Sequence, residues 1–174
     1  ALLKEGMPLG RSLLHSVWLF MESWATAGFN PQSLNILYYH SPLVELITLV
    51  IFTIGSFNFA LHFAVWTGNR QEVLRNVEIR SFFTTMMLGA AALTLGLWRA
   101  GALSGAAGMV RRGLYTLFSA HTTAGNSTLY PGSVVDSLGV VSAWALMLVM
   151  MVGGSSASTA GGFKGLRVGM IFRS

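Results

Sequence analysis

Two long apolar blocks constrain this chain more than any other feature of its sequence. Leu43 to Trp66 is 24 residues long with Glu45 as its single charged residue, and Ser81 to Trp98 is 18 residues long with none. About 20 helical residues match a hydrocarbon core roughly 30 Å thick, so both blocks are long enough to cross a bilayer. The alternative, two buried core helices of a soluble protein, is disfavoured by a charge-free run of this length.

The composition agrees with a multi-pass membrane protein whose main partner is the lipid bilayer. Only 10% of the 174 residues are charged, against roughly 25% in an average soluble domain. The formal net charge is +5, but the basic residues form short clusters between apolar blocks, as in membrane proteins, so we expect no nucleic-acid partner. The absence of cysteine excludes disulfides, thiolate metal sites and cysteine nucleophiles.

A shorter pattern occurs twice, 97 residues apart. The apolar stretches Leu13 to Ser23 and Leu114 to Ala120 are too short to span a membrane, and each runs into a loop with the sequence Thr-Ala-Gly. Glycine, asparagine and proline then end the helix, and a longer apolar run follows. The sequence therefore predicts an internal repeat of short helix, loop and long helix, with a site where the copies meet.

The Thr-Ala-Gly loops suit a dehydrated cation. A half-membrane helix directs its negative end toward the loop, and backbone carbonyls with a threonine hydroxyl can replace the water around an ion. Glycine permits the backbone angles that this requires. Potassium is the ion most easily satisfied by neutral carbonyls. A single such tripeptide also fits a small-residue patch for helix packing, but two copies in the same setting favour an ion filter.

A third Thr-Ala-Gly lies in a different setting. The apolar run from Ser137 to Val152 is 16 residues long, too short to reach the far side of the membrane, and ten small residues follow before a basic segment begins. We expect a long helix broken inside the bilayer, where bare backbone must be covered by protein or line a water-filled cavity. A linker or a phosphate cradle are alternatives, but the phosphate motif requires Ser or Thr after its lysine, and Gly165 follows Lys164.

Two stretches resemble the membrane subunit of the Trk/Ktr/HKT potassium transporters. They are Met21 to Arg80, with TAGFN, SFNFALHF and NRQEVLRNVEIRSFF, and Phe118 to Arg167, with SAHTTAGNST and GGSSASTAGGFKGLR. The resemblance implies an all-α membrane protein with pore-loop, channel-like repeats of outer helix, half-membrane pore helix, filter loop and inner helix. It places the second repeat at 1–68, from its pore helix through its inner helix, a cytoplasmic linker at 69–80 and the third repeat at 81–174.

The resemblance also assigns roles to individual residues. Asn126 departs from it, since the family usually has phenylalanine there, which leaves the packing behind the third filter strand open. The filter residues that bind K⁺ through backbone carbonyls are Thr26, Ala27, Gly28, Phe29, Thr122, Thr123, Ala124 and Gly125. The gating loop at 153–162, with the lysine beyond it, is Gly153, Gly154, Ser155, Ser156, Ala157, Ser158, Thr159, Ala160, Gly161, Gly162 and Lys164.

By the same resemblance we expect that the whole protein takes up potassium across the plasma membrane, the bacterial inner membrane, and is not an enzyme. K⁺ is the transported ion and no cofactor is expected in this chain. The implied partners are the missing first and fourth repeats, a second copy in a homodimer and a cytosolic nucleotide-binding regulatory subunit. Lys164 and Arg167 are placed either to couple the loop to that subunit or to anchor it at the membrane surface. The chain begins at Ala1 without an initiator methionine, so we expect a piece of a longer protein. Because two quarters of a filter cannot coordinate an ion, we expect this piece to be inactive alone.

Other functions and roles stay open from the residues alone. A different secondary transporter would bind a small anion at the broken helices but would favour a buried arginine near the loop. An intramembrane hydrolase using a loop serine lacks a convincing base beyond Lys164. Asn58 and His62 either line the pore or make interhelical hydrogen bonds. Glu22 and Asp136 either concentrate cations at the mouth or are solvated rim carboxylates. The sequence does not decide between potassium and sodium.

Overall fold

The computed structural model describes residues 2, 6–69, 71–99, 106–129 and 139–173. Within these ranges the chain is helical and forms no strand, which confirms the predicted all-α class. The helices are α1 (Leu9–Trp24), the 3₁₀ helix η1 (Asn35–Tyr39), α2 (Pro42–Gly55), α3 (Phe59–Trp66), α4 (Gln71–Arg75), α5 (Val77–Arg99), α6 (Ala106–His121), α8 (Val140–Val152) and α9 (Gly165–Arg173).

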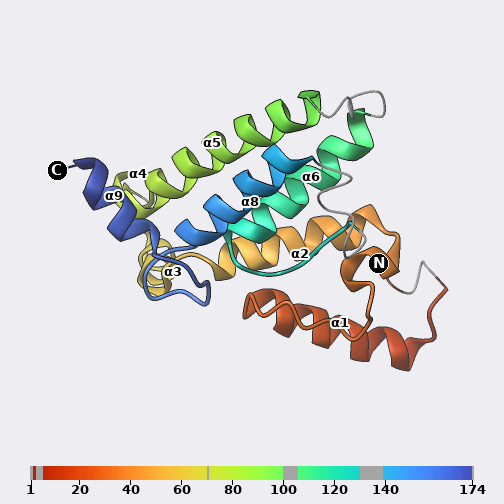
Figure 1. Cartoon of the computed structure of the whole chain (residues 1–174). Coiled ribbons are helices and arrows are strands. Elements are labelled where there is room, and N and C mark those ends of the chain that lie inside the picture. Colours follow the sequence, from red (N-terminus) through yellow and green to blue (C-terminus); the bar gives the residue numbers. More distant parts are fainter. Residues whose placement is uncertain (1, 3–5, 70, 100–105, 130–138, 174) are drawn as a thin grey trace.

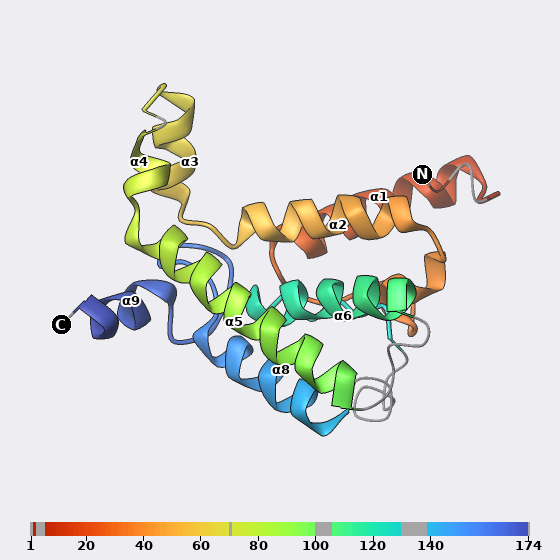
Figure 2. The same cartoon turned by 90° about the horizontal axis from the view of Figure 1, so that it is seen from above.

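The helices pack as two units joined through α2 and α6 (Figures 1 and 2). In the first unit α1 lies against α2, and in the second α5 lies against α8, α6 and α9. Each unit has its own apolar core. The first core includes Leu19, Ile36, Val44, Phe52, Tyr115 and Ala124, and the second includes Phe82, Met86, Leu93, Leu97, Leu117, Leu146 and Val149. Tyr115 lies on α6 and Ala124 in the loop that follows α6, so the first core also connects the two units.

Helix α5 confirms the apolar block from Ser81 to Trp98. It is 23 residues long and is the one helix in the described part of the chain that could cross a membrane by itself. It crosses α8 so closely that a Cβ on Gly96 would lie 2.1 Å from Oγ of Ser142. That hydroxyl donates to the carbonyl of Leu93 at 3.2 Å. Small and hydroxyl-bearing side chains at such a crossing are typical of helix packing in membranes.

The block from Leu43 to Trp66 is not the single straight span that was predicted. It forms α2 and α3, which meet at a bend of 97°. Asn58 caps the new helix, since its Oδ1 accepts a hydrogen bond from the Ala60 N–H at 2.8 Å. The end of α2 is also crowded, because a Cβ on Gly55 would lie 2.4 Å from the Trp24 carbonyl oxygen. Capping and crowding together stop one helix and begin another, which apolar length alone does not reveal.

The two short helices are longer than their apolar stretches indicated. Both α1 and α6 have 16 residues, about 24 Å at 1.5 Å per residue, still too short for a span. The predicted break after Val152 is present, because residues 153–164 are not helical and α9 begins at Gly165. The helix before this break, α8, begins at Val140 in the described part of the chain; Ser137 and Asp136 lie outside the described residues.

Candidate functional site

Helices α1 and α6 end in the same backbone turn. In each, a threonine adopts the left-handed conformation, with φ of 48° at Thr26 and 56° at Thr123. The hydrogen bonds around them are those of a Schellman motif, in which two N–H groups beyond the helix reach back to carbonyls of its last turn. These bonds are Ala27 N to Glu22 O (3.0 Å), Thr26 N to Ser23 O (3.2 Å), Ala124 N to Ser119 O (2.9 Å) and Thr123 N to Ala120 O (3.1 Å).

The backbone beyond each threonine repeats as well. Gly28 and Gly125 have φ of 71° and 73°, whereas the alanine before each glycine does not have a positive φ. A left-handed backbone is unfavourable for a β-branched residue such as threonine and costs of order 1–3 kcal/mol. The two loops therefore share an alternating and strained backbone, which the structure around them must hold in place.

The two loops lie against each other, backbone to backbone. A Cβ built on Gly28 would lie 2.7 Å from the carbonyl oxygen of Ala124 and 3.3 Å from Cα of Gly125. A Cβ built on Gly125 would lie 3.5 Å from Cα of Gly28. The fold thus brings together the glycines of the two predicted filter segments, which are 97 residues apart in the chain.

The third Thr-Ala-Gly contacts both of the earlier copies. The hydroxyl of Thr159 lies 3.3 Å from that of Thr26 and 2.9 Å from the carbonyl oxygen of Gly55. The Gly161 N–H donates to the hydroxyl of Thr123 at 2.6 Å. Residues 153–164, called the broken-helix loop from here on, are therefore docked on the ends of α1 and α6.

The end of the broken-helix loop is hydrogen-bonded to the last residues of α8, where the loop begins. Its last two N–H groups, of Phe163 and Lys164, donate to the carbonyls of Met151 and Val152 at 2.8 and 2.9 Å. The Lys164 ammonium group donates to the carbonyl of Ala160 within the loop. Lys164, the last residue of the loop, therefore bonds back to an earlier residue of the same loop. Its position in the sequence did not reveal this contact.

Three asparagines that the filter assignment leaves out connect the two Thr-Ala-Gly loops. The Asn30 amide donates to Oδ1 of Asn35 at 3.0 Å and to Oδ1 of Asn126 at 2.9 Å. The Asn35 amide donates to the carbonyl of Gly125 at 3.3 Å. Asn126, the departure from the family pattern, is only 2% exposed. Its side-chain oxygen thus takes part in the hydrogen bonds between the loops. The sequence signal for this contact was the asparagine where the resemblance leads one to expect phenylalanine.

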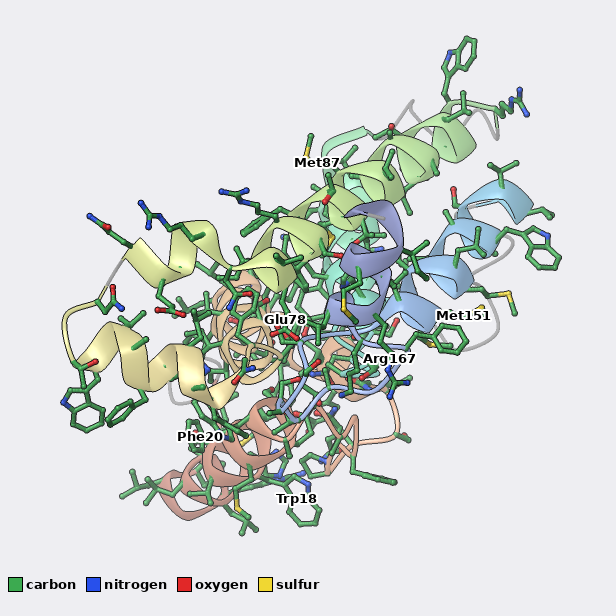
Figure 3. The ribbon with its side chains drawn as sticks, turned by 90° about the vertical axis from the view of Figure 1, so that its left-hand side faces the viewer. Trp18, Phe20, Glu78, Met87, Met151 and Arg167 are labelled. Atoms are coloured by element: carbon green, nitrogen blue, oxygen red, sulfur yellow. The ribbon has the colours of Figure 1, made fainter. Side chains whose placement is uncertain are left out.

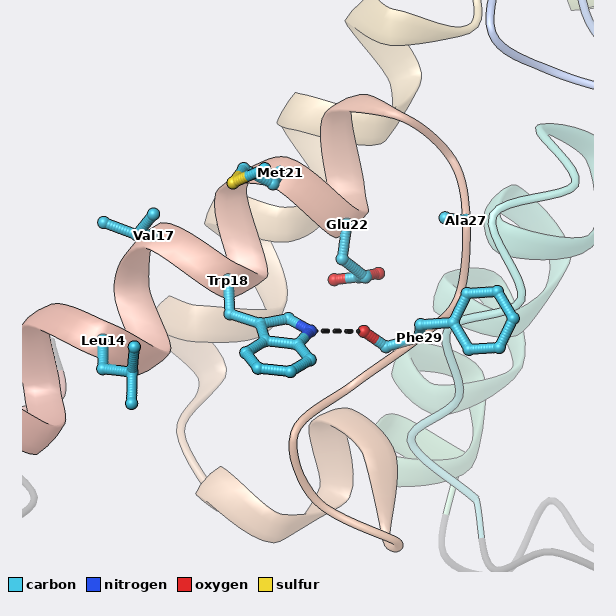
Figure 4. Close-up of a pocket in the computed structure, with 7 residues that line it drawn as sticks. All are labelled: Leu14, Val17, Trp18, Met21, Glu22, Ala27 and Phe29. Atoms are coloured by element: carbon cyan, nitrogen blue, oxygen red, sulfur yellow. Dashed lines mark hydrogen bonds between the residues drawn. The ribbon is translucent and has the colours of Figure 1, made fainter.

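A pocket lies between α1 and the first Thr-Ala-Gly loop (Figure 4). The indole N–H of Trp18 donates to the carbonyl of Phe29 at 2.9 Å and closes one side. Glu22 is 4% exposed, so the second of its two alternatives, a solvated rim carboxylate, is wrong. The pocket is lined by Leu14, Val17, Trp18, Met21, Glu22, Ala27 and Phe29.

The remaining polar residues of interest take part in hydrogen bonds. Asn58 donates from Nδ2 to Glu78 on α5, an interhelical bond of 3.4 Å. Nε2 of His62 lies 3.1 Å from the carbonyl oxygen of Ile54 across the bend. The hydroxyl of Ser158 donates to the carbonyl of Ser155 at 2.7 Å. The hydrogen-bonding alternative for Asn58 and His62 is therefore confirmed.

Half-membrane helices, paired loops at their ends and a broken long helix define an all-α membrane protein with pore-loop repeats. Known proteins with this arrangement are similar to the chain in both sequence and fold. The Trk system potassium uptake protein TrkH of Salmonella typhimurium is 28% identical over 180 residues, covering 99% of this chain and 34% of that protein. TrkH of Halomonas elongata is 30% identical over 155 residues, covering 86% of this chain and 30% of that protein.

A solved structure agrees with these relatives. The crystal structure of the potassium transporter TrkH from Vibrio parahaemolyticus matches with a TM-score of 0.75 and 25% identity, over 87% of this chain and 32% of that one. No known protein-family profile matches the chain. The chain spans about a third of the length of the relatives that it matches. The resemblance to Trk-type potassium transporter membrane subunits is thus confirmed by sequence and fold together.

Proposed function

We propose that this chain supplies two adjacent segments of a potassium filter and the gating loop beneath them, within a larger membrane subunit for potassium uptake. The observation that supports this most is the duplicated backbone at Thr26–Gly28 and Thr123–Gly125, with the two glycines in contact. Alternating signs of φ turn successive carbonyls toward one side, where they can replace the hydration shell of an ion. The names of the similar proteins, potassium uptake proteins, support the choice of ion.

The proposed assignment of the chain follows the predicted repeats. Residues 1–68 form the second repeat from its pore helix, 69–80 a cytoplasmic linker and 81–174 the third repeat. The filter segments are Thr26 to Phe29 and Thr122 to Gly125. The first and fourth repeats complete the ring, since two segments cannot surround an ion. The whole protein works in the bacterial inner membrane as a homodimer with a cytosolic nucleotide-binding regulatory subunit.

The filter is tested by adding a side chain at its glycines. In the full-length protein, Gly28→Ser and Gly125→Ser are expected to lower the potassium-to-sodium permeability ratio, because both glycines have a positive φ that a serine adopts only with strain. Gly10→Ser on α1 and Gly108→Ser on α6 are matched controls, since no atom lies within 4 Å of an added Cβ at either position. Unchanged permeability ratios in both filter variants contradict the assignment.

The gate is tested by shortening the broken-helix loop. Deleting residues 155–161 removes the contacts of Thr159 and Gly161 with the two filter threonines. We expect potassium flux through the reconstituted full-length protein to rise while the ion preference is retained, since the filter lies in other segments. Flux that does not rise in a properly folded deletion variant means that the third Thr-Ala-Gly is only structural.

A further inference from the structure

Glu78 is a buried carboxylate that the proposed filter does not use. It lies in the first turn of α5, is 4% exposed and points into the interior (Figure 3). Its Oε1 accepts a hydrogen bond from the backbone N–H of Ser156 at 2.8 Å, and its Oε2 accepts one from Nδ2 of Asn58 at 3.4 Å. A buried carboxylate is tolerated when such bonds satisfy its oxygens, and bonds to a charged acceptor are stronger than neutral ones.

The two partners of Glu78 belong to the two places where long helices are interrupted. Ser156 lies in the broken-helix loop, and Asn58 lies at the bend between α2 and α3. The two interruptions also contact each other directly. The Ser155 N–H donates to the carbonyl of Ser56 at 3.0 Å, and the Phe59 N–H donates to the carbonyl of Ala157 at 3.2 Å. The Glu78 carboxylate therefore lies where the start of α5, the bend between α2 and α3 and the broken-helix loop meet.

The geometry requires a group that accepts on both sides. The orientation of the Asn58 amide is fixed, because its Oδ1 already accepts from the Ala60 N–H and leaves Nδ2 for Glu78. The Ser156 group is a backbone N–H, which can only donate. A glutamine in place of Glu78 has one accepting oxygen and one donating NH₂, so it would set a donor against a donor on one side.

We infer that Glu78 is a positioning residue for the broken-helix loop, holding the loop on the bend of α2 and α3 and so beneath the two Thr-Ala-Gly segments. The inference rests on the proposed gating function of this loop. Glu78 lies at the start of α5, immediately after the 69–76 segment. Its hydrogen bond to Ser156 therefore links the start of α5 to the proposed gating loop in its docked position. Release of the carboxylate lets the loop leave the filter threonines.

The test uses the full-length protein with Glu78→Gln and Glu78→Ala, and reads amide hydrogen exchange over residues 153–164. We expect exchange of this segment to rise by about tenfold, the effect of losing one hydrogen bond to a charged group. Potassium flux is expected to rise in the same variants, with an unchanged potassium-to-sodium ratio. Glu72→Gln is the matched control, because Glu72 is exposed on α4 and its carboxylate accepts a hydrogen bond from Asn69 within the same short segment.

A paired exchange separates the hydrogen-bond geometry from a general loss of folding. Asn58→Asp keeps the cap on Ala60 but removes the donor to Glu78. Combined with Glu78→Gln, it restores a donor and acceptor pair in the opposite sense, with the glutamine oxygen left for the Ser156 N–H. We expect the double variant to regain protection that each single variant loses. Exchange that stays unchanged in Glu78→Gln and Glu78→Ala, or a double variant no better protected than the singles, overturns the inference. Exchange that rises without any rise in flux supports the positioning role of Glu78 and contradicts the gate.

Discussion

The two Thr-Ala-Gly loops share a backbone but differ in their side-chain surroundings. Both have left-handed threonine and glycine residues and the same pair of hydrogen bonds back to their helix. The position after the glycine differs most, since Phe29 is 78% exposed and Asn126 is 2% exposed. The feature that is duplicated is therefore the path of the main chain. A site that binds through carbonyls constrains the path and leaves the side chains behind it free to differ.

The helices that follow the two loops are interrupted by breaks of different length. In the first unit α2 gives way to α3 across a short break at 56–58, and in the second α8 gives way to α9 across the longer broken-helix loop. Only the second interruption is long enough to contain another Thr-Ala-Gly. That extra segment contacts Thr26 and Thr123 of the two proposed filter segments, so the proposed gate depends on this difference between the units.

The largest difference between the loops is expected at their glycines. An alanine at either position adopts the left-handed backbone at a cost of about 1–2 kcal/mol. Gly28→Ala adds a backbone clash, with its Cβ 2.7 Å from the Ala124 oxygen, whereas the nearest atom to a Cβ on Gly125 is 3.5 Å away. Thermal unfolding of the full-length protein in detergent should therefore show a larger loss of stability for Gly28→Ala than for Gly125→Ala. Equal losses would mean that the loops do not touch as described.

The threonines should differ by a smaller amount. Thr123→Val keeps the β-branched shape but removes the acceptor that lies 2.6 Å from the Gly161 nitrogen. Because Gly161 is exposed and water can replace the lost partner, we expect a loss of about 1–1.5 kcal/mol, the upper part of the range for a net hydrogen bond. Thr26→Val removes a long bond to Thr159 at 3.3 Å and a bond to the carbonyl of its neighbour Ala25. Thr159 keeps its bond to the Gly55 carbonyl, so we expect a loss of only about 0.5–1 kcal/mol. Unfolding midpoints of the two variants, compared in one detergent, test this order. A greater loss of stability for Thr26→Val would contradict the conclusion that the loop is held more strongly at Thr123 than at Thr26.

The asparagine between the loops should have a moderate effect. Asn126→Ala removes the acceptor for the Asn30 amide and is expected to cost about 1 kcal/mol. Asn69→Ala is the control, since Asn69 is exposed and its amide donates only to Glu72 among the described residues. The free energy of unfolding should fall in the first variant and hardly change in the second. A neutral Asn126→Ala would show that the link between the loops is not needed for stability.

The smallest effect is expected at Tyr115. Its hydroxyl lies 2.9 Å from that of Thr48, a contact between α6 and α2. Thr48 also bonds to the carbonyl of Val44 in its own helix, so Tyr115→Phe leaves no group without a partner. We expect a loss of about 0.5–1 kcal/mol, near the lower end for a net hydrogen bond. A loss several times larger would place more of the coupling between the two units at this contact.

Much of this fold follows from local sequence signals, and the exceptions are tertiary. The Ser81 to Trp98 block and the break after Val152 are visible because apolar length and runs of glycine and serine are local properties. The bend between α2 and α3 is not visible, since it depends on the Trp24 carbonyl beside Gly55 and on contacts with a loop about 100 residues away. A continuous apolar run indicates burial in lipid or protein but not a straight helix.

In the candidate site, too, the features that the sequence predicted follow from local signals and those that it missed are tertiary. The meeting of the two Thr-Ala-Gly loops was predicted from their repetition. The contacts of the third copy with both of them, and the junction at Glu78, depend on which segments pack together and appear only in the structure. Glu78 itself stood in the sequence as one more charge in a polar linker. Nothing local distinguishes a carboxylate that meets two donors from one that meets water.

The most direct test of the account is the position of a bound ion in the full-length protein. Rubidium substitutes for potassium and can be located by its anomalous X-ray scattering in crystals of the complete subunit. We predict a rubidium peak bordered by the carbonyls of residues 26–28 and 123–125, directly above the broken-helix loop. A crystal in which rubidium occupies other sites, with no peak between these two segments, would contradict the central claim that the paired Thr-Ala-Gly loops form the filter.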